Sequence, residues 1–173
     1  MPRKPDIGLE VAILDSALGL LDEAGVEAVK MREVAKRART TTPTLYERFQ
    51  DREALLWGVV ARVQDDLLQC VRDAESLERM AEILLGYFAK FPGRLDLMNQ
   101  YWPRIMGSDH PKPVLEFARK KFSSAMGDER AFSLMALLIG TAMMMHVAGQ
   151  ESPVSNALRN SSLKAARVLC REM

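Results

Sequence analysis

The 173-residue sequence is poor in cysteine, histidine and aromatic residues, and each shortage excludes a class of protein. Cys70 and Cys170 are too few and too far apart for a disulfide framework or a thiolate metal site. The two histidines, His110 and His146, have no partner at metal-ligand spacing, so we expect no metal. The chain also contains no GxSxG motif, no HExxH motif and no phosphate-binding glycine loop. We therefore predict no enzyme activity, no catalytic residues and no cofactor.

Segments that would direct the chain to a membrane or out of the cell are also missing. The basic first five residues are not followed by the apolar run of a signal peptide. The most apolar segment, residues 131–149, has 19 residues without a formal charge, close to the length that spans a bilayer. Ser133, Thr141 and His146 dilute it, so we interpret it as a buried helix. We expect a cytoplasmic protein that does not cross a membrane.

Apolar residues recur at helical spacing throughout the chain, and no alternation with period two indicates a strand. We therefore predict an all-α fold with an N-terminal three-helix head at residues 1–51 and a C-terminal helical domain at residues 52–173. In the head, a helix over Leu9–Ala24 is stopped by Gly25 and packs on two shorter helices. A long fourth helix begins after the capping residue Asp51. It ends near Arg72, and further helices are expected at about 77–91, 95–106 (kinked or ended by Pro103), 114–126 (ended by Gly127), 131–149 and from Ser152 onward.

The most informative segment is residues 31–49, MREVAKRARTTTPTLYERF. Its apolar residues from Met31 to Ala38 share one face of a short helix that ends at the turn Arg39-Thr40. Thr41 or Thr42 then offers a hydroxyl cap to a second helix, and Pro43 suits the first turn of that helix. Leu45 and Phe49 point into the core, which leaves Thr42, Thr44, Tyr46, Glu47 and Arg48 on the outer face. A two-turn helix with such a face suits insertion into the major groove of double-stranded DNA.

Positive charge is concentrated in the same segment. The whole chain has 24 basic and 23 acidic residues, a balance that argues against non-specific coating of nucleic acid. Residues 30–52 nevertheless hold seven basic and three acidic side chains, a net charge of +4, whereas the rest of the chain holds 17 basic and 20 acidic ones, a net charge of −3. A solvated charged face would explain a basic cluster alone. Its coincidence with the expected DNA-reading helices favours phosphate binding.

The run Thr42-Pro43-Thr44-Leu45-Tyr46, followed by Phe49 and Asp51–Leu56, resembles the tetracycline-repressor-type (TetR) family of bacterial regulators. The resemblance covers roughly Val11 to Val60. It implies a helix-turn-helix head whose fourth helix is a strut that joins the head to a regulatory body. Arg39 departs from the family pattern, which usually has glycine there, and Lys30 stands where Ser or Thr usually caps the first motif helix. A left-handed residue other than glycine costs about 1–2 kcal/mol, so we expect a strained or slightly altered turn, with both cations offered to phosphates.

The outward face and the resemblance together give the expected DNA contacts. Arg32 matches a family position that often reaches a base edge, where an arginine can bind guanine with two hydrogen bonds. Arg52 matches the usual phosphate-binding lysine of the family. The alternative for Tyr46 is that its ring has a purely structural role and does not contact DNA. The expected base contacts are Arg32, Thr42, Pro43, Thr44 and Arg48, and the expected phosphate contacts are Thr41, Tyr46 and Arg52.

Apolar, adaptable side chains spread over four helices of the C-terminal domain predict a ligand pocket, although each of them could be ordinary core. No cluster of charges in this domain indicates a polar ligand, so we expect a modest-sized hydrophobic or aromatic effector. The expected lining is Tyr87, Phe88, Met98, Tyr101, Trp102, Phe117 and Met135.

The segment 131–149 is apolar on all sides, so one of its sides needs a partner beyond its own chain. Small residues on this segment and on the last helix permit close approach of two subunits in a four-helix interface, which the resemblance also implies. The expected interface of the homodimer is Ala136, Gly140, Val154, Ala157, Leu158, Ser161 and Ala165.

These features predict a DNA-binding transcriptional regulator, a repressor that binds a palindromic operator as a dimer, with half-sites about 34–36 Å apart. An effector in the body would tilt the strut and move the two recognition helices off that spacing. The alternative is a helical hydrophobe- or lipid-binding module whose head serves another partner.

Overall fold

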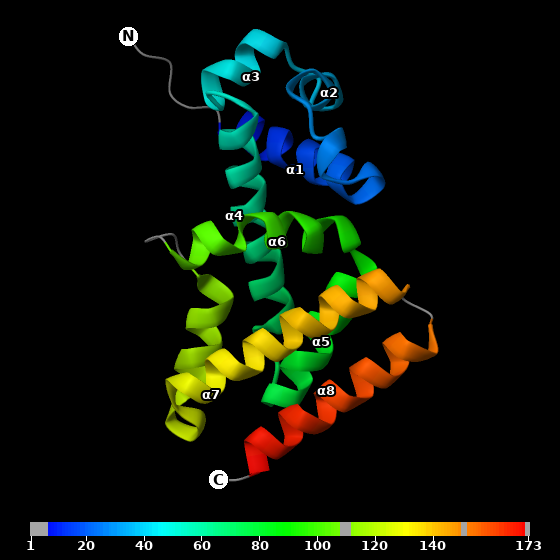
Figure 1. The fold of residues 1–173 in the computed structure, drawn as a ribbon. Coiled ribbons are helices and arrows are strands. Elements are labelled where there is room, and N and C mark those ends of the chain that lie inside the picture. Colours follow the sequence, from blue (N-terminus) through cyan, green and yellow to red (C-terminus); the bar gives the residue numbers. More distant parts are fainter. Residues whose placement is uncertain (1–6, 108–111, 150–151, 172–173) are drawn as a thin grey trace.

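The structure is a computed structural model that describes residues 7–107, 112–149 and 152–171. Side chains at 118–119, 121–128, 131–132, 135 and 169–171 are outside the described part. The described residues form helices and no strand, so the all-α prediction is confirmed (Figure 1). The elements are α1 (Ile7–Ala24), the 3₁₀ turn η1 (Val26–Ala28), α2 (Met31–Arg37), α3 (Thr42–Arg48), α4 (Arg52–Val71), α5 (Leu77–Lys90), α6 (Pro92–Met106), α7 (Pro113–Ala148) and α8 (Pro153–Arg171).

Helices α1, α2 and α3, with η1, form a head at one end of the molecule, and α4 leads from the head into the body (Figure 1). α1 ends where the sequence predicts, because Gly25 adopts φ 76°, a left-handed conformation that glycine reaches without steric cost. The three helices share one core, in which Ile13, Val34 and Leu45 are each 0% exposed. Burial of a side chain of this size contributes about 1.5–3 kcal/mol, so packing in the head fixes how α3 is presented.

The body consists of α5, α7 and α8. α5 and α7 pack against α4, α8 packs against α5 and α7, and α6 crosses α4 between the head and the body (Figure 1). α8 lies antiparallel beside the last turns of α7. The hydroxyl groups of Thr141 and Ser162, 2.5 Å apart, lie between these two helices, and Ser155 is fully buried there. α6 begins at Pro92, earlier than the sequence predicts, and continues past Pro103.

The structure corrects the sequence prediction for α7. The sequence predicts two helices, 114–126 and 131–149, with Gly127 ending the first, but one helix runs from Pro113 to Ala148. The prediction was wrong because a glycine inside a helix costs only about 1 kcal/mol, while Glu129 and Arg130 just beyond it are good helix formers. The first and last turns of α7 run in different directions (Figure 1). None of the described helices combines the length and the hydropathy needed to cross a bilayer.

One buried arginine of α6 fastens the head to the body. Arg94 donates two hydrogen bonds to Asp22 of α1, at 2.8 and 2.6 Å, and one of 2.9 Å to Asp66 of α4. The same guanidinium donates to the Tyr87 hydroxyl at 2.5 Å and lies over the Phe91 ring, 3.9 Å from its centre. Burial alone would lower the pKa of Arg94, but the hydrogen bonds to Asp22 and Tyr87 hold that pKa above the ordinary arginine value. Four helices therefore meet at a single charged group.

Candidate nucleic-acid interface

α2 ends in a tight turn built around Arg39. This residue has φ 54°, the one positive φ of a non-glycine residue in the described part of the chain. The N–H of Thr40 donates to the carbonyl of Ala35 at 2.9 Å, and the N–H of Arg39 donates to the carbonyl of Lys36 at 3.3 Å. These two bonds are the Schellman pattern, in which the position of Arg39 usually holds glycine. The turn therefore keeps the usual geometry and carries the backbone strain that the sequence predicts.

α3 begins on the threonine cap that the sequence predicts. The hydroxyl of Thr41 accepts a hydrogen bond from the N–H of Thr44 at 3.3 Å, and Pro43 lies in the first turn. The hydroxyl groups of Thr41 and Thr44 also lie 2.8 Å apart, so the Thr44 side chain is held in place by the cap. Leu45 and Phe49 are 0% and 8% exposed. Their burial turns the opposite face of α3 outward.

The predicted DNA contacts lie together on α2, on α3 and at the start of α4, at the end of the head farthest from the body (Figure 1). None of them is enclosed by the protein. Arg32, Thr41, Pro43 and Tyr46 are exposed, and Thr42, Thr44, Arg48 and Arg52 are half-buried.

Arg52 has structural partners that sequence reasoning missed. Its Nε donates to the carbonyl of Val29 at 2.8 Å, and its Nη2 donates to the carbonyl of Val26 at 2.7 Å. These bonds tie the start of α4 to η1, and no local pattern in the sequence signals them because their partners are more than twenty positions away. The expected phosphate contact of Arg52 stays a prediction, and it would use the remaining N–H groups of the guanidinium.

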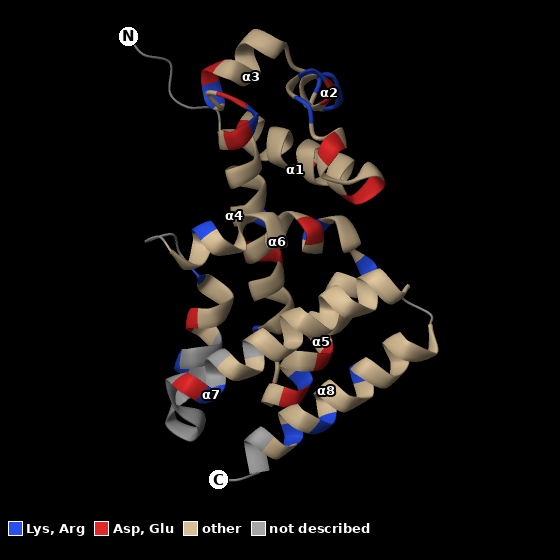
Figure 2. Cartoon of the chain, viewed as in Figure 1, with Lys and Arg blue, Asp and Glu red and all other residues tan. Residues whose placement is uncertain are grey.

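Fewer basic side chains of the head are available for phosphates than the number of basic residues suggests, because some of them are paired with acidic residues. Arg37 donates two hydrogen bonds of 2.6 Å to Glu23, so its charge is compensated. These bonds lower the pKa of Glu23 and raise the pKa of Arg37. Within the described part, Arg32, Lys36 and Arg39 form no ion pair. Figure 2 shows the basic residues of α2 at the outer end of the head, with acidic residues of α1 nearer the body.

Residues 13–57, which hold this helix-turn-helix, match the family described as "Bacterial regulatory proteins, tetR family". The helix-turn-helix head of this chain is therefore of the tetR type. An uncharacterised HTH-type transcriptional regulator of Mycobacterium tuberculosis is 23% identical over 142 residues, 73% of this chain and 75% of that protein. The HTH-type transcriptional repressor KstR of Rhodococcus jostii is 46% identical over 50 residues, 29% of this chain and 24% of that protein. With this tetR-type head, the chain is a DNA-binding transcriptional regulator.

Solved structures share the fold of this chain over nearly its full length. A regulator from Streptomyces coelicolor gives a TM-score of 0.61 at 23% identity and covers 95% of this chain and 99% of its own. A TetR variant from Acinetobacter baumannii, in complex with minocycline, gives a TM-score of 0.66 at 16% identity and covers 94% of each chain. Identities this low establish the fold alone, with its N-terminal helix-turn-helix and its C-terminal helical domain.

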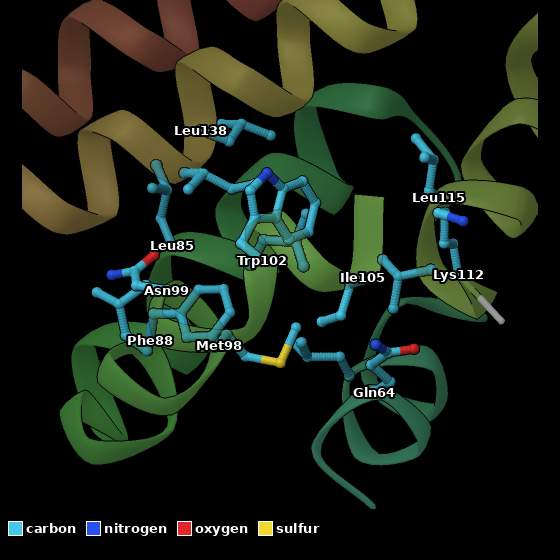
Figure 3. A pocket seen from close by; sticks show the side chains of 15 residues that line it. Gln64, Leu85, Phe88, Met98, Asn99, Trp102, Ile105, Lys112, Leu115 and Leu138 are labelled. Carbon is cyan, nitrogen blue, oxygen red and sulfur yellow. The ribbon is translucent and has the colours of Figure 1, made fainter. Parts of the chain in front are cut away.

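The body of this regulator contains a small cavity of about 60 Å³ between α4, α5, α6 and α7 (Figure 3). Three of the predicted pocket residues, Phe88, Met98 and Trp102, line it. The predicted residue Phe117 is half-buried against the core and is not part of the lining, and the side chain of Met135 lies outside the described part. Sequence reasoning missed most of the lining, because the leucines look like ordinary core and the polar members stand on separate helices. The missed residues are Gln64, Leu67, Leu84, Leu85, Leu95, Asn99, Ile105, Lys112, Val114, Leu115, Leu138 and Ile139.

The sequence also predicts Tyr87 and Tyr101 in this lining, but the structure places both rings elsewhere. The Tyr87 hydroxyl accepts a hydrogen bond from Arg94, and the Tyr101 hydroxyl donates to Glu53 at 2.9 Å. A buried tyrosine needs a partner for its hydroxyl, and both partners lie toward the head rather than in the cavity. Burial raises the pKa of Tyr87 to about 12, and burial together with the hydrogen bond to Glu53 raises that of Tyr101 to about 12.

The predicted interface residues all lie at the surface of α7 and α8. Ala136, Val154, Ala157 and Ser161 are exposed, and Gly140, Leu158 and Ala165 are half-buried. Large apolar side chains surround them, since Met144 is 58% and Val147 is 87% exposed. These residues recur at helical spacing, so they form one apolar face across the two helices.

Proposed function

We propose that this chain is a repressor that binds a palindromic operator as a homodimer and releases it when a small hydrophobic or aromatic effector enters the body. The observation that carries the proposal is α3, a two-turn helix capped by Thr41 and turned outward beside the uncompensated cations of α2. The name of the repressor KstR, to which this chain is 46% identical over 50 residues, supports the repressor role.

In this proposal residues 1–51 read DNA, with α3 in the major groove. Phosphate contacts set the register of the head, and base contacts set its sequence preference. The base contacts are Arg32, Thr42, Pro43, Thr44 and Arg48, and the phosphate contacts are Thr41, Tyr46 and Arg52. Each subunit then reads one half-site, and the half-sites lie about 34–36 Å apart.

The apolar face of α7 and α8 supports the homodimer. Monomeric proteins rarely expose contiguous apolar patches larger than a few hundred Å². A second copy related by a two-fold axis would cover this face with the same face of its own and form a four-helix interface. Residues 52–173 would then supply both the dimer contacts and the effector site. The dimer contacts proposed are Ala136, Gly140, Val154, Ala157, Leu158, Ser161 and Ala165.

The joint at Arg94 supports release by an effector. α4 and α6 line the cavity, and Arg94 connects both of them to Asp22 in the head. A molecule that separates α4 from α6 would move the head of one subunit relative to the head of the other. The distance between the two α3 helices would then no longer match the spacing of the half-sites. To shift the equilibrium from 1:99 to 99:1, the effector needs about 5.5 kcal/mol of differential affinity for the released form. Minocycline is the ligand of the Acinetobacter baumannii structure of the same fold.

The first test is selection of bound sequences from a random DNA pool with the full chain. We expect an inverted repeat, and Arg32→Ala should relax the preference at one base pair of each half-site. Lys36→Ala is the matched control, because Lys36 is an exposed cation on the same helix. If each Lys36 of the dimer neutralises one phosphate, this variant should weaken binding to all sequences alike and lower the salt slope by about 1.8. Loss of sequence preference in Lys36→Ala but not in Arg32→Ala would refute the assignment.

Salt dependence separates the proposal from a hydrophobe-binding module whose head serves another partner. A dimer that neutralises roughly 6–10 phosphates loses about 10³–10⁵ in affinity between 50 and 200 mM salt. A flat response would favour the module.

The homodimer is tested by Gly140→Leu. No atom of the chain lies within 4 Å of a Cβ built on Gly140, so leucine fits the folded subunit but projects from the apolar face. Gly86→Leu on α5 is the matched control, since its Cβ position is equally open. Sedimentation should show monomers for Gly140→Leu and dimers for the control. If both variants sediment as dimers, the apolar face of α7 and α8 is not part of the dimer interface.

A further inference from the structure

One wall of the body cavity carries a polar side chain without a protein partner. Gln64, on α4, is only 8% exposed and lines the cavity (Figure 3). Within the described residues its amide forms no hydrogen bond. An amide that lines an apolar cavity and has no protein partner can form a hydrogen bond with a ligand group, and such a bond contributes about 1 kcal/mol. Gln64 therefore offers hydrogen-bond donors and an acceptor inside an otherwise apolar site.

The rest of the described lining determines which ligand can reach Gln64. Among the described residues no acidic side chain lines the cavity, and the formal charge in this described lining belongs to the half-buried Lys112. The other walls are hydrocarbon or aromatic, apart from the amide of Asn99. An amide can replace the hydrogen bond that an uncharged polar group of the ligand makes to water. It cannot offset the large cost of removing a charged group from water. The lining therefore favours an uncharged ligand that is mostly hydrocarbon.

Trp102 determines how large that ligand can be. The cavity of about 60 Å³ is smaller than an engineered cavity of about 150 Å³ that binds benzene. Trp102 also lines a groove of about 350 Å³ that reaches Gly140 and Met143 on α7. Trp102, Leu115 and Ile139 line both spaces, so a ligand that displaces the half-buried Trp102 side chain can extend from the cavity into the groove. The combined space is of the size of ordinary ligand sites, about 300–1,000 Å³.

We propose that the effector is an uncharged, mainly hydrocarbon molecule with one carbonyl or hydroxyl oxygen that hydrogen-bonds the amide of Gln64. Its role as effector rests on the proposed function, but its binding can be measured without DNA. Gln64 stands two positions before Asp66, which binds Arg94. A molecule held by Gln64 therefore acts on the helix that carries the head.

The experiment uses three probes of matched size that differ in their terminal group: isopentylbenzene (hydrocarbon), benzylacetone (ketone) and hydrocinnamate (carboxylate). Calorimetry measures their binding to the full chain and to Gln64→Leu, with Gln64→Met as a second apolar variant and thermal unfolding as the folding control. Either variant should weaken benzylacetone about tenfold and leave isopentylbenzene unchanged or tighter, because only the ketone loses a hydrogen bond. Hydrocinnamate should bind the natural chain at least tenfold more weakly than benzylacetone.

Lys112→Gln distinguishes the competing class of ligand. It should leave benzylacetone binding unchanged. Tighter binding of hydrocinnamate than of benzylacetone, abolished by Lys112→Gln, would overturn the proposal in favour of a carboxylate ligand. No binding of benzylacetone, or equal binding to both Gln64 variants and the natural chain, would also overturn it. Binding through Gln64 by a chain that selects no DNA sequence would refute the proposed function alone.

Discussion

Replacement of Arg39 by glycine should stabilise the protein and weaken its binding to DNA. Arg39 has φ 54° in the Schellman turn after α2, a conformation that costs a non-glycine residue about 1–2 kcal/mol. Glycine removes this strain but loses about 0.5–1 kcal/mol through the greater freedom of the unfolded chain. The free energy of unfolding of Arg39→Gly should therefore rise by about 0.5–1 kcal/mol. The melting temperature should rise by about 1–4 °C.

Arg39→Ala is the matched control for the charge. Alanine removes the cation but keeps the Cβ that clashes, so Arg39→Gly should be more stable than Arg39→Ala by about 1 kcal/mol. Both variants should bind operator DNA equally weakly. If each Arg39 of a dimer neutralises one phosphate, the slope of log affinity against log salt should fall by about 1.8 in each variant.

Urea unfolding of the three chains and DNA titrations at several salt concentrations measure the two effects separately. Equal stability of the glycine and alanine variants would refute the strain argument. An unchanged salt slope would show that Arg39 contacts no phosphate.

Two further predictions concern the joint between head and body. Arg94→Leu should lower the free energy of unfolding by roughly 3 kcal/mol in urea titrations, because two partly buried aspartates lose their cation. Arg94→Lys should recover less than half of this loss. A loss below about 1 kcal/mol in Arg94→Leu would contradict the role of Arg94 as the joint. The pKa values of Tyr87 and Tyr101, raised from 10.0 to about 12, predict that the folded state binds their protons more tightly than the unfolded state does. The contribution of these two tyrosines to stability should therefore be constant below pH 10 and fall as the pH rises from 10 to 12, and Tyr87→Phe or Tyr101→Phe should reduce that fall in urea titrations.

The sequence alone determined the features that depend on a few neighbouring residues. The cap of α3 at Thr41, the stop of α1 at Gly25 and the left-handed Arg39 each involve atoms within five positions of one another. Apolar spacing in the same way predicts which face of a helix is buried, since it follows from the helical period. For these reasons the outward face of α3 could be predicted before the structure was known.

Only the tertiary structure decided what lies between the helices. Asp22 and Arg94 are 72 positions apart, and nothing near either residue indicates that they bind each other. The same holds for Tyr101, which turns to Glu53 instead of the cavity, and for Gln64, which lines the cavity together with apolar side chains of three other helices. The spacing of apolar residues along a helix predicts that a residue is buried, but it does not predict which residues it contacts. Those contacts depend on how helices distant in the sequence pack together. The DNA-reading surface was therefore predictable from local rules, whereas the cavity and the joint required the whole fold.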